Sequence, residues 1–279
     1  MSKPSVLGRT ALALAVLMGL FFLSVEAQAS PEIKKEYLAY NIIKLAKGQK
    51  ALLVVKSRPV LHVIGDKLGT LDAYHVISGK ARGDKQRRGD LKTPEGTYFF
   101  VESIDGKKLP GRYGVLAVVT DYPNPIDRQA KKTGSGIWLH GTDDPPRLKR
   151  PRDSKGCVVA LNDDVLRIIN YIEIGRTPVI VVEALVRGSL EEAAETGKEI
   201  SKFLIVKGLL KAKEKNNLSI FRHSNGFVAT VARGTKTDRY YIKKDKAGWS
   251  LIGKESQVVG GKSQSLLDVQ GKPRDLNKK

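Results

Sequence analysis

The amino-acid sequence predicts an α+β protein: a β-rich domain, built as a mixed sheet or sandwich with one main helix, followed by a small α+β appendage. Short apolar and β-branched runs, separated by turns that contain Gly and Pro, recur between residues 50 and 184. A clear helical spacing of apolar residues occurs once within this region. After Leu185 the composition changes to a charged helical pattern, which further short strands follow.

The β-rich domain at residues 50–184 follows an N-terminal segment, residues 30–49, that is predicted to be helical. Strands are expected at residues 52–55, 60–64, 74–77, 97–101, 115–120, 137–140 and 178–183. The last of these reads PVIVVE, a continuous apolar run that is typical of a central, buried strand. A helix is expected from residue 162 to about residue 174, with Asn162 or Asp163 as its N-cap.

Residues 188–255 are expected to form the α+β appendage. Ser189 precedes a run with helical character, LEEAAETGKEISKFLIVKGLLKAKEK, although Gly197 and Gly208 are unfavourable within a helix. Residues 218–253 are typical of three or four short strands, and Ser224-Asn225-Gly226 indicates a hairpin turn. The polar and basic residues 256–279 are expected to form a flexible tail.

The first 29 residues have the features of a secretory signal peptide. Lys3 and Arg9 are followed by the apolar run ALALAVLMGLFFLSV, and the small-x-small pattern Ala27-Gln28-Ala29 precedes the expected cleavage point. The alternative is an uncleaved N-terminal anchor, but the apolar run is short for a membrane span of about 20 residues. We therefore expect an exported protein, located in a periplasm or cell envelope.

The chain of 279 residues is strongly basic, with 49 Lys and Arg against 29 Asp and Glu, a formal net charge of +20. Such a charge favours polyanionic partners. No nucleic-acid-binding motif is recognisable, and aromatic residues do not alternate with the basic runs as stacking platforms would. We expect no nucleic-acid partner and instead a peripheral contact with anionic envelope surfaces. One alternative is a basic envelope-binding protein without catalytic activity.

The sequence contains one cysteine and four histidines. This composition excludes an intramolecular disulfide and a Cys-rich zinc site. No His-x-x-x-His spacing, nucleotide-binding glycine pattern or serine nucleophile elbow is present. We therefore expect neither a metal nor another cofactor.

Cys157 and His140 are the candidate nucleophile and base. Cys157 ends the turn Asp153-Ser154-Lys155-Gly156-Cys157, and the cations on the preceding loop are expected to favour its thiolate. His140 ends the strand at 137–140 and lies 157 − 140 = 17 residues earlier. The proline-rich loop between them can fold back and bring the imidazole to the sulfur. The alternatives are an inert, buried cysteine and a structural histidine at a strand end.

The region from about Ala51 to Glu183 resembles the L,D-transpeptidase (YkuD) catalytic domain family. The resemblance is carried by the segments LLVVK, GDLKTPEGTYFF, IWLHGTDDP and DSKGCVVALNDDV. A His-Gly strand end followed at this distance by Ser-x-Gly-Cys is similar to the active-site signature of the family. The form Ser-Lys-Gly-Cys resembles its Gram-negative branch, which includes enzymes that attach lipoproteins to peptidoglycan or release them.

The resemblance implies a mechanism and a set of site residues. Cys157 would attack a peptidoglycan stem tetrapeptide and form a thioester, with His140 as general base and acid. The backbone carbonyl of Gly141 would orient the imidazole, Ser154 matches the motif serine, and N–H groups around Gly156 and Cys157 would hold the oxyanion. An acceptor amine, from a second stem peptide or an envelope protein, would then resolve the thioester.

The sequence departs from the family pattern at two positions. Lys155 replaces the histidine of the common Ser-His-Gly-Cys motif, and Val159 replaces an arginine two residues after the cysteine. These departures leave the choice of donor open. The sequence also leaves open whether water resolves the thioester, which would make the protein a peptidoglycan L,D-endopeptidase or carboxypeptidase, or a lipoprotein-releasing hydrolase. The segment Thr93-Pro94-Glu95-Gly96 is expected to frame the cleft.

Overall fold

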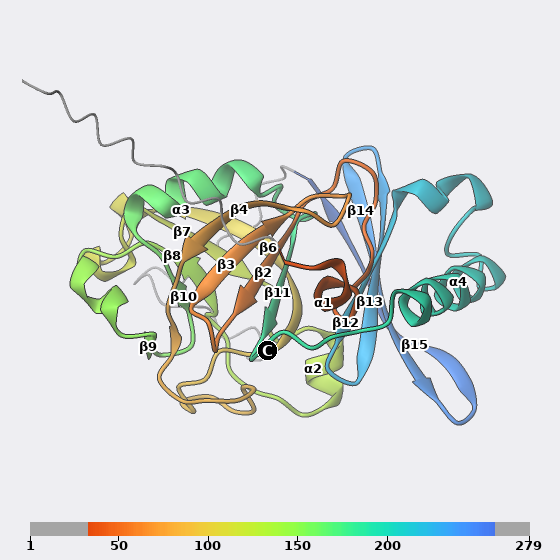
Figure 1. The fold of residues 1–279 in the computed structure, drawn as a ribbon, viewed down its shortest axis with the longest axis horizontal. Coiled ribbons are helices and arrows are strands. Elements are labelled where there is room, and N and C mark those ends of the chain that lie inside the picture. The colour runs from red at the N-terminus through yellow and green to blue at the C-terminus, as the bar shows by residue number, and fades with distance from the viewer. Residues whose placement is uncertain (1–32, 260–279) are drawn as a thin grey trace, which may run out of the picture.

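The computed structural model describes residues 33–259 and contains two large β-sheets that lie against each other (Figure 1). One helix, α3 (Asn162–Ile168), packs on the outer face of the larger sheet, and another, α4 (Leu190–Val206), packs on the outer face of the smaller one. The described chain is therefore layered as helix, sheet, sheet and helix. The fold class expected from the sequence, a β-rich domain followed by a smaller α+β unit, is confirmed.

The larger sheet is mixed, as expected, and has eight strands. Its pairs β8–β10 and β2–β11 are parallel, and the other neighbouring pairs are antiparallel. The spatial order of the strands is β10 (Val158–Val159), β8 (Trp138–His140), β7 (Leu116–Thr120), β6 (Gly96–Asp105), β11 (Pro178–Val182), β2 (Ala51–Val55), β3 (Val60–Ile64) and β4 (Thr70–His75). The central position predicted for the strand that begins at Pro178 is therefore confirmed.

The smaller sheet is antiparallel and has five strands. Their order is β1 (Ile42–Lys44), β12 (Leu218–His223), β13 (Gly226–Arg233), β14 (Lys236–Asp245) and β15 (Gly248–Val258). The hairpin turn predicted at Ser224 and Asn225 does connect β12 to β13. We refer to this sheet with α4 as the C-terminal unit.

Three boundary predictions were wrong. The helical segment predicted at residues 30–49 is helical only in α1 (Lys35–Ala39), and β1 then joins the sheet of the C-terminal unit. Residues 256–258, predicted as the start of a flexible tail, belong instead to β15, which continues to Val258. The long helix predicted after Ser189 ends at Val206, just before Gly208, which has the positive φ (68°) that glycine adopts readily. The predicted signal peptide and residues 260–279 lie outside the described residues.

The remaining described elements are short. The helix α2 (Pro125–Gln129) begins with an Asn124 capping box, and β5 (Ser78–Gly79) pairs with β9 (Arg152–Ser154). The 3₁₀ turns are η1 (Gly106–Lys108), η2 (Gly111–Tyr113), η3 (Pro145–Lys149), η4 (Ile169–Tyr171) and η5 (Ala212–Asn217). No helix within residues 33–259 is long and apolar enough to cross a membrane.

Strand β2 is apolar at every position because it lies between two apolar cores. Leu52 and Val54 point into the core beneath α3, whereas Leu53 and Val55 point into the core between the two sheets. Successive side chains on a strand point to opposite faces, so a strand between two cores needs apolar residues throughout. The same reasoning explains the continuous apolar run of β11.

A buried lysine at the end of β2 holds the loop at residues 80–95, which we call the site loop. The Lys56 ammonium group donates to the carbonyl oxygens of Gly83 (2.9 Å) and Thr93 (3.1 Å), and it pairs with the Glu95 carboxylate (2.9 Å). The Thr93 hydroxyl accepts the N–H of Gly79 at 2.8 Å. Thr93 and Glu95 therefore anchor the site loop; the expectation that their segment frames a cleft stays a prediction.

Candidate active site

The parallel pairing of β8 and β10 brings the candidate nucleophile and base onto neighbouring strands. Val159 is in register with His140, and Cys157 directly precedes Val158, which is in register with Leu139. Cys157 thus lies level with Trp138, and both pack in the same small apolar cluster. Since His140 and Trp138 share one face of β8, ordinary strand spacing places the Cα atoms of Cys157 and His140 about 8 Å apart.

His140 has a defined tautomer. Its Nδ1 atom lies 2.6 Å from the carbonyl oxygen of Gly141, so Nδ1 carries the proton and donates it in this hydrogen bond. The Nε2 lone pair is then available to accept a proton. The ring is only 4% exposed, and the edge of the Tyr113 ring packs against it with centroids 5.0 Å apart. The structure thus contains the Gly141 contact that the resemblance implied.

Burial sets the protonation state of His140. It lowers the pKa of the imidazole to about 4; the hydrogen bond to Gly141 opposes this shift, and the nearby charges of Arg147 and Arg112 add to it. His140 is therefore neutral at neutral pH, as a general base must be.

Cys157 is also neutral in this structure. Its Sγ–H donates to the carbonyl oxygen of Gly136 at 3.4 Å, and its side chain is partly exposed. Burial among apolar groups raises the thiol pKa to about 11, although the Trp138 N–H and the charges of Arg147 and Lys85 act in the opposite direction. Of the loop cations expected to favour the thiolate, Arg147 does act in that direction, but desolvation outweighs it and leaves the thiol protonated.

The low pKa of His140 predicts an unusual pH dependence for the acylation of Cys157. Since the His140 pKa lies near 4, we expect the rate of Cys157 acylation to stay high through mildly acidic pH and to fall below about pH 4 to 5, where the imidazole becomes protonated. Acylation rates measured by intact-mass analysis across this range test the prediction. An acid limb centred near the ordinary histidine value, about 6.5, would contradict it.

The turn before Cys157 is held by Ser154. The Ser154 hydroxyl donates to the carbonyl oxygen of Cys157 (2.6 Å) and accepts the N–H of Gly156 (3.0 Å). Gly156 has φ 130°, and a Cβ atom there would lie 2.8 Å from the Lys92 carbonyl oxygen, so only glycine fits. The Gly156 N–H is thus already bonded, which corrects its predicted role as an oxyanion donor. The N–H of Cys157 remains the candidate.

Asn162 supports the backbone that follows His140, a role that the sequence did not reveal. It was predicted as a helix cap, but the N-cap residue of α3 is Leu161. The Asn162 Oδ1 atom instead accepts the N–H groups of Thr142 (3.1 Å) and Val115 (3.2 Å). A Cβ atom at Gly141 would lie 2.2 Å from this oxygen, which explains the glycine after the histidine.

Arg147 is the cation of the proline-rich loop that reaches the site. Its guanidinium donates to the Asp153 carbonyl oxygen at 2.8 Å, and its charge acts on both His140 and Cys157. Lys155, by contrast, is exposed. Tyr113, from the 3₁₀ turn η2, and Lys85, from the site loop, complete the surroundings of the pair, and no spacing in the sequence pointed to them.

The other polar side chains do not form a metal site. Within residues 33–259 there is no group of three or more His, Cys, Asp and Glu side chains that could hold a metal ion. His62 is buried in β3, and His75 contacts the Leu148 carbonyl oxygen through Nε2 at 2.8 Å. His223 lies in the C-terminal unit, where it contacts β6.

Comparison with known proteins gives the same family that the sequence resembles. Residues 49–181 match the L,D-transpeptidase catalytic domain, YkuD. YafK of Escherichia coli (strain K12), itself only provisionally named an L,D-transpeptidase, is 27% identical over 146 residues, which cover 51% of this chain and 52% of YafK. The chain thus matches about half the length of this curated relative.

Two solved structures resemble most of the chain. Bd1075 of Bdellovibrio bacteriovorus superposes with a TM-score of 0.58 and 25% identity, covering 78% of this chain and 97% of Bd1075. The helical cell shape determining protein Pgp2 of Campylobacter jejuni superposes with a TM-score of 0.50 and 20% identity, covering 76% of this chain and 94% of Pgp2. These two structures show a shared fold, and the family match assigns residues 49–181 to the L,D-transpeptidase (YkuD) catalytic domain family.

Proposed function

We propose that this protein is an exported cysteine acyltransferase that cleaves and re-forms peptide bonds in peptidoglycan stem tetrapeptides. The observation that carries the proposal is the position of Cys157 directly before β10, beside the strand β8 that ends in His140, with the imidazole fixed by Gly141 so that Nε2 can accept a proton. Membership of residues 49–181 in the L,D-transpeptidase family supports the choice of substrate.

The first half-reaction follows from the neutral pair. As Sγ of Cys157 attacks the carbonyl carbon of the bond between the L-centre and D-Ala, Nε2 of His140 takes the thiol proton. The backbone N–H of Cys157 is the candidate donor to the oxyanion. The intermediate then collapses to a thioester, and the imidazolium returns its proton to the departing D-Ala amine. The Gly141 carbonyl oxygen stabilises the imidazolium through the Nδ1 hydrogen bond.

The second half-reaction resolves the thioester. A neutral amine of a second stem peptide, or of an envelope protein, attacks the thioester carbonyl, gives up a proton and displaces the Cys157 thiolate, which is then reprotonated. Attack by water would instead release the free acid and make the protein a hydrolase. The nucleophile and base are the same in both reactions, so the identity of the product distinguishes them.

The expected location fits this substrate. Residues 1–29 have the composition of a signal peptide, and the net charge of +20 favours contact with an anionic cell envelope. Export would bring Cys157 to peptidoglycan, which lies outside the cytoplasmic membrane.

The decisive experiment incubates the purified chain, without residues 1–29, with tetrapeptide muropeptides and identifies the products by mass spectrometry. With an acceptor amine present, we expect loss of the terminal D-Ala and a new amide to the acceptor. Without an acceptor, a hydrolase would yield the tripeptide. Absence of both products, or equal turnover by the Cys157→Ala variant, would refute the proposal.

A further inference from the structure

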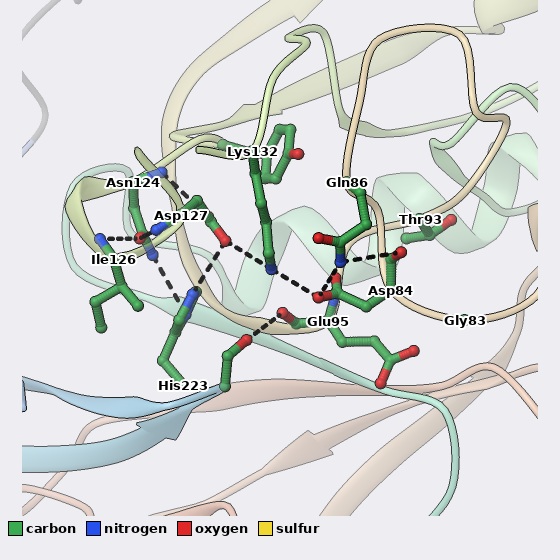
Figure 2. Close-up of polar contacts among 12 residues, drawn as sticks. Gly83, Asp84, Gln86, Thr93, Glu95, Asn124, Ile126, Asp127, Lys132 and His223 are labelled. Carbon is green, nitrogen blue, oxygen red and sulfur yellow. Dashed lines mark hydrogen bonds and ion pairs between the residues drawn. The ribbon is translucent and has the colours of Figure 1, made fainter. Parts of the chain in front are cut away.

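A fully buried histidine of the C-terminal unit reaches into the larger sheet. His223 ends β12, and its Nδ1 atom accepts the N–H of Thr97 in β6 at 2.9 Å. Nε2 therefore carries the ring proton and donates it to the carboxylate of Asp127 at 3.3 Å (Figure 2). A Cβ atom at Gly96 would lie 2.5 Å from the imidazole, so the glycine at the start of β6 makes room for the ring.

The carboxylate of Asp127 is connected to the site loop through Lys132. Asp127 is completely buried and pairs with the Lys132 ammonium at 3.0 Å, which in turn pairs with Asp84 at 2.7 Å (Figure 2). The other oxygen of Asp84 accepts the N–H of Glu95 at 2.8 Å and so ties the two ends of the site loop together. We call these four side chains the cross-sheet chain: His223, Asp127, Lys132 and Asp84.

The cross-sheet chain keeps the carboxylate of Asp127 ionised although it is buried. Burial alone would raise the pKa of Asp127, but the hydrogen bonds from His223 and Lys132 and the charge of Lys132 outweigh it and hold that pKa below its ordinary value. Removing one member would leave a buried charge without its partner, which a protein avoids by rearranging. We therefore expect a substitution at His223 to alter the position of Asp84.

The residue that follows Asp84 in the site loop, Lys85, is also a buried lysine. The Lys85 ammonium donates to the Asp90 carboxylate (2.7 Å) and to the Arg87 carbonyl oxygen (3.1 Å). A Cβ atom at Gly134 would lie 3.1 Å from Cε of Lys85, so the lysine packs against Gly134, two residues before Gly136, whose carbonyl oxygen accepts the Sγ–H of Cys157. The Lys85 charge is one of those that favour the thiolate.

We propose that the C-terminal unit sets the reactivity of Cys157, because the cross-sheet chain fixes the site loop and thereby keeps Lys85 packed against the Gly134–Gly136 segment that contacts the sulfur. His223, Lys132 and Lys85 are thus positioning residues, and none of them needs to touch the substrate. The C-terminal unit thus acts on the Cys157 thiol itself, whichever acyl donor or acceptor the protein uses.

The expected effect is measurable on the thiol itself. If the Lys85 ammonium moves away, the pKa of Cys157 rises, and each unit of rise lowers the thiolate fraction about tenfold. The more basic thiolate is also a better nucleophile, which returns part of that loss, so the net decrease in alkylation rate is about threefold per unit.

The experiment measures the alkylation of Cys157 by iodoacetamide as a function of pH in the chain without residues 1–29. Cys157 is the only cysteine of the sequence, so the reaction reports on this sulfur alone. We expect Lys132→Met to shift the alkylation profile to higher pH and to lower the rate at neutral pH about three- to tenfold. Lys132→Arg, which keeps the charge, should restore most of the rate.

A double-variant cycle tests the route through Lys85. Lys85→Met should lower the alkylation rate at least as much as Lys132→Met, and the double variant should show no further decrease, because both act through the same ammonium group. Additive effects of the two substitutions would overturn the proposal. If Lys132→Met does not fold, Asp84→Asn serves in its place, since its amide oxygen can still accept the N–H of Glu95.

Arg239→Met is the matched control. Arg239 is a buried cation of the C-terminal unit that crosses to the larger sheet, where it pairs with Asp121 (3.3 Å) and donates to the Gly175 carbonyl oxygen (2.9 Å). None of its described contacts reaches the site loop. We expect this variant to lower the melting temperature without changing the alkylation profile. An unchanged profile for Lys132→Met, or an equal shift for Arg239→Met, would reject the coupling.

Discussion

Replacing Cys157 with alanine is expected to abolish formation of the acyl-enzyme. The family resemblance implies that a carbapenem acylates the nucleophilic cysteine, so the wild-type chain should gain the mass of one drug molecule and the Cys157→Ala variant none. No second cysteine can take over, because the sequence contains only this one. Turnover of tetrapeptide muropeptides should fall to the uncatalysed level in the same variant. Intact-mass analysis and product analysis measure the two effects.

Two controls make this result specific. The Cys157 side chain is partly exposed and packs at the edge of the Trp138 cluster, so its loss should leave the melting temperature close to that of the wild type. Lys155→Ala changes an exposed residue of the same turn and should still be acylated. An adduct of the same mass on Cys157→Ala would show that another side chain is the nucleophile.

Local sequence signals predicted the parts of the site that local geometry determines. The apolar run that ends in His140 and Gly141, and the turn that ends in Gly156 and Cys157, each have a residue pattern that specifies a strand end or a tight turn. The parallel pairing of β8 with β10 then brings the two together. The proline-rich loop between them was predicted correctly to fold back, because a parallel neighbour requires a return connection.

Long-range contacts carried no such signal. Strand β1 pairs Ile42 with Phe221, which lies 221 − 42 = 179 positions later in the sequence. Its short apolar pattern fitted a helix equally well, and the partner strand decided the outcome. Asn162 was misread for a related reason. An asparagine before a helix usually caps it, but here two N–H groups from distant segments compete successfully for the same oxygen.

The protonation state of the nucleophile could not be predicted from the neighbouring charges. The sequence shows many cations near Cys157, but it does not show which of them approach the sulfur or how much water the fold excludes. In the structure, the backbone N–H of Trp138 and the charges of Arg147 and Lys85 lower the thiol pKa, and burial outweighs all three. A thiol–imidazole pair that is neutral at rest depends more on its base than a preformed thiolate does.

Because the neutral pair depends on its base, replacing His140 with alanine is expected to slow acylation strongly. Without the imidazole, no group takes the thiol proton during attack, and the high thiol pKa leaves little thiolate at neutral pH. We expect the rate of carbapenem acylation to fall about 10²–10⁴-fold, the usual contribution of general acid–base catalysis. Unlike Cys157→Ala, the variant should still acylate slowly, and faster as the pH rises toward the thiol pKa. Stopped-flow or intact-mass kinetics across pH measure both effects.

His75→Ala provides the matched control for His140→Ala. His75 is an exposed histidine at the end of β4, and its ring contacts only the Leu148 carbonyl oxygen among the described polar groups. Its loss should change the acylation rate by less than about threefold, within the range of ordinary surface substitutions. Added imidazole should partly restore His140→Ala and have no effect on His75→Ala. If His140→Ala acylates within tenfold of the wild type and keeps its pH profile, the base must be another group, and the neutral pair inferred from the two pKa shifts does not operate.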